Sequence, residues 1–257
     1  MKKLYILFFW ILGISTWAAH SDVPPSPHNS YIVPASVLAP QDYFITQWDL
    51  SKIGSAVSEE TTSLTFGVAV VGAVNYSWTT TDNSSSESRV IANGNTTANI
   101  TGLPAGKTIV LSIEPANLRR FYINYGTDKQ RLTDVKQWGV VAWSSLLNAF
   151  YGSSNLNISA TDVLNLGNVT SMYSMFAFCS NLNGPSNINN WDTSKVTSMG
   201  YMFCLASVFN QNIGSWNTAN VTNMSFMFYN VSVFNQNVAH LLKIYKKDEV
   251  VAKKVLK

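Results

Sequence analysis

The chain has 257 residues, of which 46% are hydrophobic and only 12% are charged. That length accommodates two domains, or one domain followed by a short array of repeats. Residues 22–240 carry 9 basic and 12 acidic side chains, a net charge of −3 (9 − 12), whereas residues 241–257 carry six Lys and two acids. The body therefore offers no basic surface that could neutralise phosphates, which excludes nucleic acid as a partner.

The N-terminus has the pattern of a secretory signal. Two lysines precede an apolar run over 4–14, and small residues follow at 15–19. Such a run is too short to span a bilayer of about 30 Å. Cleavage after Ala18 predicts a signal peptide over 1–18 and an exported chain with no transmembrane segment after signal removal. A retained signal anchor is the alternative interpretation.

The next segments predict an arm and a β-rich domain. Residues 19–42 form a proline-rich arm with five prolines. Residues 62–71 and 74–78 alternate apolar with polar side chains, and short apolar segments follow at 88–91, 97–101 and 107–113 between glycines and prolines. Short strands at this spacing predict an antiparallel β-sandwich over 43–123, with a connector over 124–142.

The most informative feature is a repeat over 169–237. Three copies of Val-Thr-Ser/Asn-Met-x-x-Met-Phe end at Phe176, Phe203 and Phe228, and a degenerate earlier copy ends at Phe150. These phenylalanines are 26, 27 and 25 residues apart. Such a period is typical of supersecondary units that bury their apolar faces against one another, and it predicts a repeat solenoid over 143–241.

The spacing within a unit favours one short helix and one short strand. Val169, Met172 and Cys179 belong to an apolar series spaced by three and four, which indicates one face of a helix. The repeated threonine, Thr170 in the first copy, stands where a hydroxyl could cap that helix. The segments 188–191 and 213–216 are expected as strands. The fold expected is therefore mixed, an N-terminal antiparallel β-sandwich followed by a short α/β repeat solenoid that is leucine-rich-repeat-like.

The repeat also predicts a structural ladder of buried side chains in the solenoid interior. Each Met-x-x-Met pair is followed by Phe in the same register, and two units end in Trp. The ladder comprises Met172, Met175, Phe176, Trp191, Met199, Met202, Phe203, Trp216, Met224, Met227 and Phe228.

The repeated residues resemble a known family. Trp191-Asp-Thr-Ser-Lys-Val-Thr-Ser-Met-Gly-Tyr-Met-Phe203 and Phe209-Asn-Gln-Asn-Ile-Gly-Ser-Trp are similar to the BspA-like repeats of bacterial surface proteins, and the resemblance covers 143–241. It implies a secreted or cell-surface bacterial protein with an adhesive role. The sandwich resembles PKD-type or fibronectin-like modules, although Trp78-Thr-Thr-Thr-Asp-Asn stands where a PKD-type module has Trp-Gly-Asp-Gly.

Histidine argues against catalysis. The three histidines are His20, His28 and His240, so residues 43–238 contain none. A Ser–His–Asp site, a Cys–His site and a His-based zinc site each need a histidine, so none of them can form within these residues. We therefore expect no enzyme and no cofactor, with a His-free hydrolase as the remaining enzymatic alternative.

Other residues that could carry chemistry have simpler explanations. The acids Glu59, Glu60, Asp162 and Asp192 are scattered, which suits solvated surface better than a glycosidase pair. Methionine thioethers can hold Cu(I), but their shared register with the phenylalanines favours core packing, so no metal is expected.

Two features near the end of the repeats complete the sequence-based expectations. Cys179 and Cys204 fall at different phases of the repeat, which favours two separate buried thiols over a disulfide. Residues 242–257 are lysine-rich and free of Gly and Pro, so they are expected to form a C-terminal helix that caps the last unit, or else a tail.

The expected function is that of an exported surface or adhesion-type binding protein. Its neutral, Asn-, Ser- and Thr-rich repeat surface would be displayed to a protein or glycan partner on a host or neighbouring cell. The alternative is a carbohydrate-binding accessory module whose site lies in the sandwich near Trp78 and the polar loop that follows it.

Overall fold

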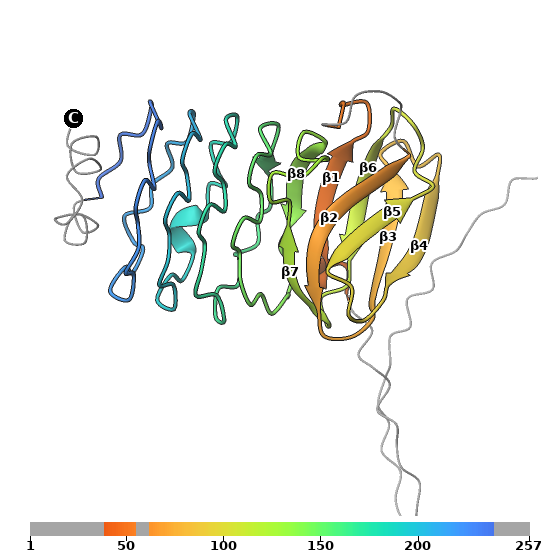
Figure 1. Cartoon of the computed structure of the whole chain (residues 1–257), viewed down its shortest axis with the longest axis horizontal. Helices are drawn as coiled ribbons and strands as arrows, with labels where there is room; N and C mark the ends of the chain where they lie inside the picture. Colours follow the sequence, from red (N-terminus) through yellow and green to blue (C-terminus); the bar gives the residue numbers. More distant parts are fainter. Residues whose placement is uncertain (1–38, 55–61, 239–257) are drawn as a thin grey trace, which may run out of the picture. The chain divides into compact units, whose positions relative to one another are not determined.

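Two β-sheets form the N-terminal half of the described chain (Figure 1). The computed structural model describes residues 39–54 and 62–238. The expected signal peptide, most of the proline-rich arm and the expected C-terminal helix or tail lie outside these residues. The sheets and the described repeat units belong to one compact unit.

The first sheet has the strand order β4-β3-β6-β1-β8-β9 and the second has the order β5-β2-β7. The strands of the first sheet are β1 (Phe44–Asp49), β3 (Val74–Thr80), β4 (Ser86–Ile91), β6 (Thr108–Ile113), β8 (Leu132–Gln137) and β9 (Asn157–Ile158). Those of the second are β2 (Ser63–Val70), β5 (Thr97–Thr101) and β7 (Leu118–Tyr122). Two short 3-10 helices, η1 (Pro40–Asp42) and η2 (Ile188–Asn190), are the helical elements among the described residues.

The sheets pack face to face because apolar residues alternate along each strand. In β1, Phe44 and Trp48 are fully buried. Trp48 stacks on Phe66 of the second sheet with ring centroids 5.8 Å apart, and Phe44 meets the edge of Phe121 at 5.2 Å. Strands β2 to β6 lie at the segments that the sequence pattern predicts, whereas β1, β7 and β8 were not expected individually. Together they form a β-sandwich-like layer pair.

The prediction of an α/β repeat solenoid is wrong. In place of the helix expected after Val169, the chain makes consecutive turns, and no α-helix occurs among the described residues. Ser174 (φ 52°) and Phe178 (φ 61°) have left-handed backbone conformations four residues apart. A right-handed helix cannot continue through such residues. Spacings of three and four therefore arise here from turns rather than from a helix.

The hydrogen bonds explain why turns replace the helix. The N–H groups of Met172, Ser174 and Phe176 donate to carbonyls of the next unit, at 2.9 Å in each case. The alternate N–H groups of Met175 and Ala177 donate three residues back within their own unit. Half of the donors thus join one unit to the next, whereas an α-helix would use all of them internally.

The expected strands and caps of the repeat are also corrected. Residues 188–190 form η2, and residues 214–215 form a turn rather than a strand. The hydroxyl of Thr197 donates to the carbonyl of Thr170 at 3.1 Å, and that of Thr222 to the carbonyl of Thr197 at 3.2 Å. The repeated threonine thus links neighbouring units instead of capping a helix.

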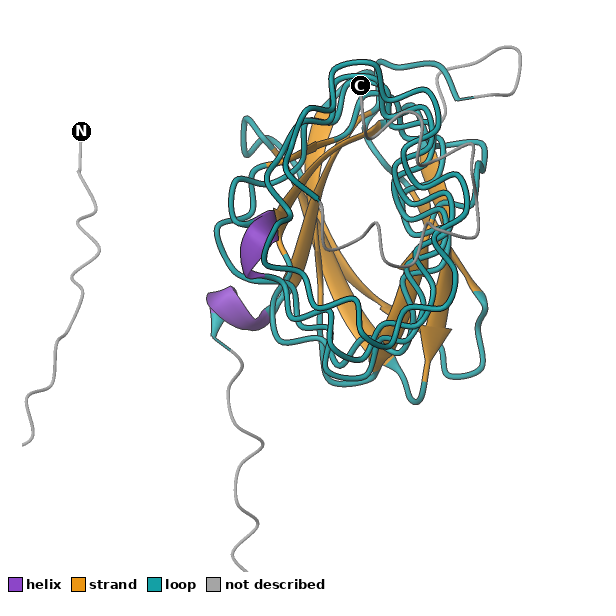
Figure 2. Ribbon diagram, turned by 90° about the vertical axis from the view of Figure 1, so that its left-hand side faces the viewer, coloured by secondary structure: helices purple, strands orange, loops and turns teal. Residues whose placement is uncertain are grey.

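The repeat units continue both layers of the sandwich. β8 pairs antiparallel with β1 and parallel with β9, which belongs to the first unit. On the other layer, the N–H groups of Ile123 and Tyr125 donate to the carbonyls of Ala149 and Tyr151, both at 2.9 Å. The first unit therefore covers one edge of each sheet, and these two edges would otherwise expose unpaired peptide groups. Figure 2 shows the later units superposed on these two layers.

One row of rings runs through the interior of the units. Phe150, Phe176, Phe203 and Phe228 stack with successive centroid separations of 5.5, 5.8 and 5.8 Å and interplanar angles of 10°, 18° and 10°. Phe121 of β7 lies 5.8 Å from Phe150 and joins this row to the sandwich core. The structure places all eleven residues of the expected ladder in this interior, none more than 4% exposed.

A buried ion pair fastens the start of the repeats to the sandwich. Arg131 donates to the Asp128 carboxylate at 3.0 Å, to the Lys52 carbonyl at 2.9 Å and to the Ser63 carbonyl at 3.2 Å. The second oxygen of Asp128 accepts the N–H of Thr65 at 2.8 Å. Because both charges are desolvated, each depends on the other for compensation.

Replacing Phe203 by Ala should lower the free energy of unfolding by about 3–5 kcal/mol, because it removes a fully buried ring from the stacked row. Urea denaturation measures this change. Val208→Ala in the same unit, at a side chain 42% exposed, serves as the control and should change it little. Equal effects of the two substitutions would contradict the stacked interior.

Replacing Asp128 by Ala should lower the free energy of unfolding by about 3–5 kcal/mol, because the Arg131 charge then stays buried without a partner. The matched control is Glu87→Ala, which removes an ion pair with the exposed Arg89 and should have a much smaller effect. Chemical denaturation of both variants tests this. A similarly small effect of the two would show that water reaches the Arg131 site.

Candidate functional site

A groove of about 590 Å³ lies over the turns of the repeat units. None of its eleven lining residues is charged, and Asn148 and Ser174 are among the polar ones. Six of the eleven are aromatic, and we call this surface the aromatic groove: Tyr151, Tyr173, Phe178, Tyr201, Phe226 and Tyr229.

The groove rings follow one another from unit to unit. Tyr173 and Tyr201 have centroids 5.5 Å apart, and Tyr201 and Phe226 stack at 5.0 Å with an interplanar angle of 28°. On the other side, Tyr151 lies 5.6 Å from Phe178. Phe178 is 39% exposed and Tyr229 is 49% exposed, so the rows present ring surface to solvent.

Tyr125, from the loop before β8, extends the second row beyond the groove. Its centroid lies 5.0 Å from that of Tyr151 and 5.8 Å from that of Phe178, and its side chain is 50% exposed. The ammonium of Lys129 lies 4.5 Å from the Tyr125 ring centroid in a cation–π contact.

Several of these aromatic residues have left-handed backbone conformations. The φ angles are 61° at Phe178, 56° at Tyr201 and 56° at Phe226. For a residue other than Gly this conformation costs on the order of 1–2 kcal/mol, and Asn accepts it more readily than a bulky residue. Strain of this kind persists where the side chain serves something other than the local fold.

The equivalent positions of sister units show what the backbone alone would favour. Asn148 and Ser174 occupy the position of Tyr201, and Gly152, Leu205 and Asn230 occupy that of Phe178, all with positive φ. Asn and Gly are the residues that this backbone conformation suits best. The aromatic side chains in the middle units are therefore not required by the turn itself.

The electrostatics of the groove favour a neutral ligand. Burial raises the pKa of the Tyr173 hydroxyl, and the neighbouring Tyr201 adds to the rise. The Tyr173 hydroxyl thus remains a protonated hydrogen-bond donor at physiological pH. A lining of uncharged rings, hydroxyls and amides gives no attraction for a strongly charged partner.

Of the two cysteines, Cys204 lines the groove and Cys179 does not. Cys179 and Cys204 are both buried and are not joined in a disulfide, which confirms the prediction of two separate thiols. Burial raises the pKa of the Cys179 thiol, whose Sγ donates to the Phe150 carbonyl at 3.0 Å. A thiol held protonated in this way is a poor nucleophile.

The second expected site, near Trp78, has a different character. The Trp78 side chain is only 3% exposed and faces the sandwich core, so its ring cannot stack on a sugar. A hollow of about 440 Å³ lies on the outer side of these strands, between residues such as Ser77, Ser88 and Ser112. This hollow offers hydroxyls without an exposed aromatic ring.

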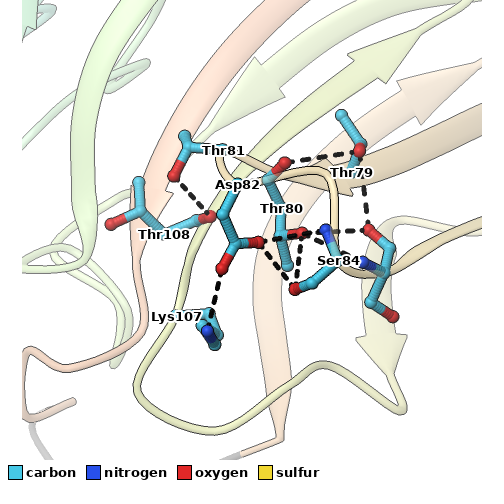
Figure 3. Close-up of polar contacts among 8 residues, drawn as sticks. Thr79, Thr80, Thr81, Asp82, Ser84, Lys107 and Thr108 are labelled. Carbon is cyan, nitrogen blue, oxygen red and sulfur yellow. Dashed lines mark hydrogen bonds and ion pairs between the residues drawn. The ribbon is translucent and has the colours of Figure 1, made fainter.

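The polar loop after Trp78 is tied to itself and to Lys107 (Figure 3). The Asp82 carboxylate accepts Lys107 Nζ at 2.9 Å and the Ser84 hydroxyl at 2.6 Å. The Lys107 ammonium, followed by Ser84 and Thr80, holds the pKa of the Asp82 carboxyl well below its usual range. The loop's best acceptor is therefore already engaged.

The other carboxylates considered from the sequence serve the backbone. Asp162 accepts the N–H groups of Trp138 at 2.9 Å and Gly139 at 2.8 Å. Asp192 accepts the N–H of Ser194 at 3.0 Å, as expected for a turn. Glu59 and Glu60 lie outside the described residues, and within residues 39–54 and 62–238 no group of His, Cys, Asp and Glu could hold a metal ion.

Sequence reasoning missed the aromatic groove, although a signal was present. In each Met-x-x-Met copy one of the two intervening residues is aromatic: Tyr173, Tyr201 or Phe226. A buried helix or turn would place polar residues there with no loss of packing. Aromatic residues retained between the buried methionines, in every copy, therefore mark an outward-facing surface.

Replacing Tyr201 and Phe226 together by Asn should change the free energy of unfolding by no more than about 1 kcal/mol, because relief of left-handed strain offsets the lost ring contacts. Thermal and urea unfolding test this expectation. Phe203→Asn, at a fully buried ring of the same turns, is the control and should be strongly destabilising. A loss as large as that of the control would make the groove rings structural.

Comparisons with known proteins found one similarity, to a protein family. Residues 126–250 match a family described as Mycoplasma protein of unknown function, DUF285. No curated protein matches the chain, and no solved structure does. In the part of the chain that the structure describes, no helix is long and apolar enough to cross a bilayer. The chain is thus similar, over its repeats and the segment before them, to a family whose description names a bacterial genus and no function.

Proposed function

We propose that this protein is an exported or cell-surface binding protein of adhesion type, which holds its partner in the aromatic groove. The observation that carries the proposal is the row of partly exposed rings at left-handed positions, above all Tyr201 and Phe226. These side chains add strain to the turn and present their ring surface outward. Binding of a partner is the function that explains both properties.

The composition of the groove supports a binding role. Tyrosine is enriched in recognition surfaces because its ring gives a large contact area at low conformational cost and its hydroxyl adds a directional hydrogen bond. Four tyrosines line the groove, together with Phe178 and Phe226. A concave surface of about 590 Å³ is within the size range of ligand sites.

The construction beneath the groove supports the same proposal. Tyr151, Tyr173 and Tyr201 belong to turns whose N–H groups bond the next unit, and the inward neighbours of Tyr201, Met202 and Phe203, are fully buried. A ring row on such a base is held in place before the partner arrives. Preorganisation of this kind reduces the entropic cost of binding.

The bacterial surface setting rests on the resemblance of the repeats to BspA-like proteins and on the signal-like N-terminus. The match to a family described from Mycoplasma agrees with a bacterial origin. The alternative of a carbohydrate site near Trp78 has less support, because that ring is buried and the loop beside it is internally bonded. The groove is therefore the better candidate for the binding surface.

Attachment of beads coated with the full chain to cultured epithelial cells, and to surfaces carrying matrix proteins or mucin, tests the function. Tyr201→Asn with Phe226→Asn should reduce attachment about ten-fold, the change that loss of ~1.4 kcal/mol produces. Val208→Ala with Val233→Ala, exposed side chains of the same two units, should leave it unchanged. Equal attachment of the groove variant and the unaltered chain would refute the proposal.

A further inference from the structure

We infer that the ligand of the aromatic groove is a neutral glycan chain that lies along the ring rows, across several repeat units. This inference rests on the function proposed above and specifies the chemistry of the partner. It assigns the groove to sugar rings rather than to a charged polymer or a peptide. Three properties of the groove lead to it.

The first property is charge. The eleven lining residues include no acid and no base, and Lys129, a cation beside the rows, is engaged over the Tyr125 ring. A sulfated or uronate-rich glycan, or an acidic peptide, would bury its charge against neutral rings without compensation. An uncharged ligand avoids this penalty.

The second property is the period of the rows. Successive rings lie 5.5 Å (Tyr173–Tyr201) and 5.0 Å (Tyr201–Phe226) apart, one for each repeat unit. A proline-rich peptide returns the same face only every three residues, about 9.3 Å at ~3.1 Å per residue. It would therefore engage every second ring. A glycan carries a ring in every monomer and can cover a row that has no gaps.

The third property is the mixture of rings and polar groups. A pyranose has an apolar face of C–H groups that packs on the negative face of an aromatic ring, and hydroxyls around its edge. Tyr173 is tilted by 50° from Tyr201, so the row is not a closed face-to-face stack and leaves ring surface open to a sugar. The hydroxyls of Tyr173, Tyr201 and Ser174 and the amide of Asn148 lie beside it. Hydroxyl groups can both donate to and accept from such partners.

The test uses the full chain and defined oligosaccharides in calorimetric titrations. The probes are dimers, tetramers and hexamers of β-1,4-linked glucose and of β-1,4-linked N-acetylglucosamine, with heparin and decaproline as charged and peptide competitors. At least one neutral series should bind, with affinity that rises from dimer to hexamer because longer chains cover more rings. Heparin and decaproline should not displace the hexamer.

Variants assign the binding to the rings. Tyr201→Asn with Phe226→Asn should weaken hexamer binding at least ten-fold, whereas Tyr201→Phe, which keeps the ring, should retain most of it. Val208→Ala with Val233→Ala is the matched control outside the groove and should have no effect. Equal affinity for dimer and hexamer, or hexamer binding that survives the Asn substitutions, would overturn the inference.

Attachment to cells separates failure of this inference from failure of the proposed function. An excess of the neutral hexamer that binds in the titrations occupies the groove and should abolish attachment. Attachment that resists the hexamer but is lost in the Asn variant would overturn the glycan inference and leave the binding function intact. Decaproline binding in the groove, without binding of any neutral hexamer, would do the same in favour of a peptide ligand.

Discussion

The repeat half of the protein depends on how each unit divides its backbone N–H groups. Those of Met172, Ser174 and Phe176 bond the next unit, and those between them close turns within their own unit. This alternation bonds each turn to the neighbouring unit. It is incompatible with an α-helix, which would use all of these N–H groups internally. It also sets the separation of the units, because the rings of Phe176 and Phe203 then stack at 5.8 Å. The same separation is imposed on every side chain that the turns present outward.

The functional surface is a consequence of this internal order. Buried Met and Phe residues fix the inner side of each turn, and left-handed residues at its corners direct Tyr201 and Phe226 to the outer side. Polar side chains, such as Thr197 and Asn210, are used largely between units, where the hydroxyl of Thr197 and the amide oxygen of Asn210 bond their neighbours. The neutral, Asn- and Thr-rich composition thus serves assembly of the stack as well as its surface.

The strands of the sandwich and the register of the repeat units could be predicted from the sequence, through the alternation of apolar residues and the period of the phenylalanines. Val74, Tyr76 and Trp78 alternate with polar residues, which fits the inward-facing side of β3, and the spacing of the phenylalanines gives the register of the units. The helix could not be distinguished from turns, because both repeat an apolar residue every three or four positions. The residue that decides between them, such as Tyr201 with its φ of 56°, is one for which local preference opposes the conformation observed.

The candidate site could be predicted only in part for the same reason. Trp78 was predicted as a binding residue because it is an aromatic residue beside a polar loop. Its place in the alternation of β3, however, puts its side chain inside the sandwich. Tyr173, Tyr201 and Phe226 lie between buried methionines, and the last two have left-handed backbone conformations that no propensity indicates. A surface made by neighbouring units becomes visible only when the separation between those units is known.

The hydrogen bonds between units also determine how the protein would respond to mechanical load. They run from one unit to the next, so tension between the sandwich and the last unit acts on them in series. Each unit contacts mainly its neighbours, and the weakest boundary would therefore open first while the others hold. Extension under force would proceed in steps of one repeat, each releasing a length of chain. A ligand that spans several units would tie those boundaries together and make the attached protein stiffer than the unattached one.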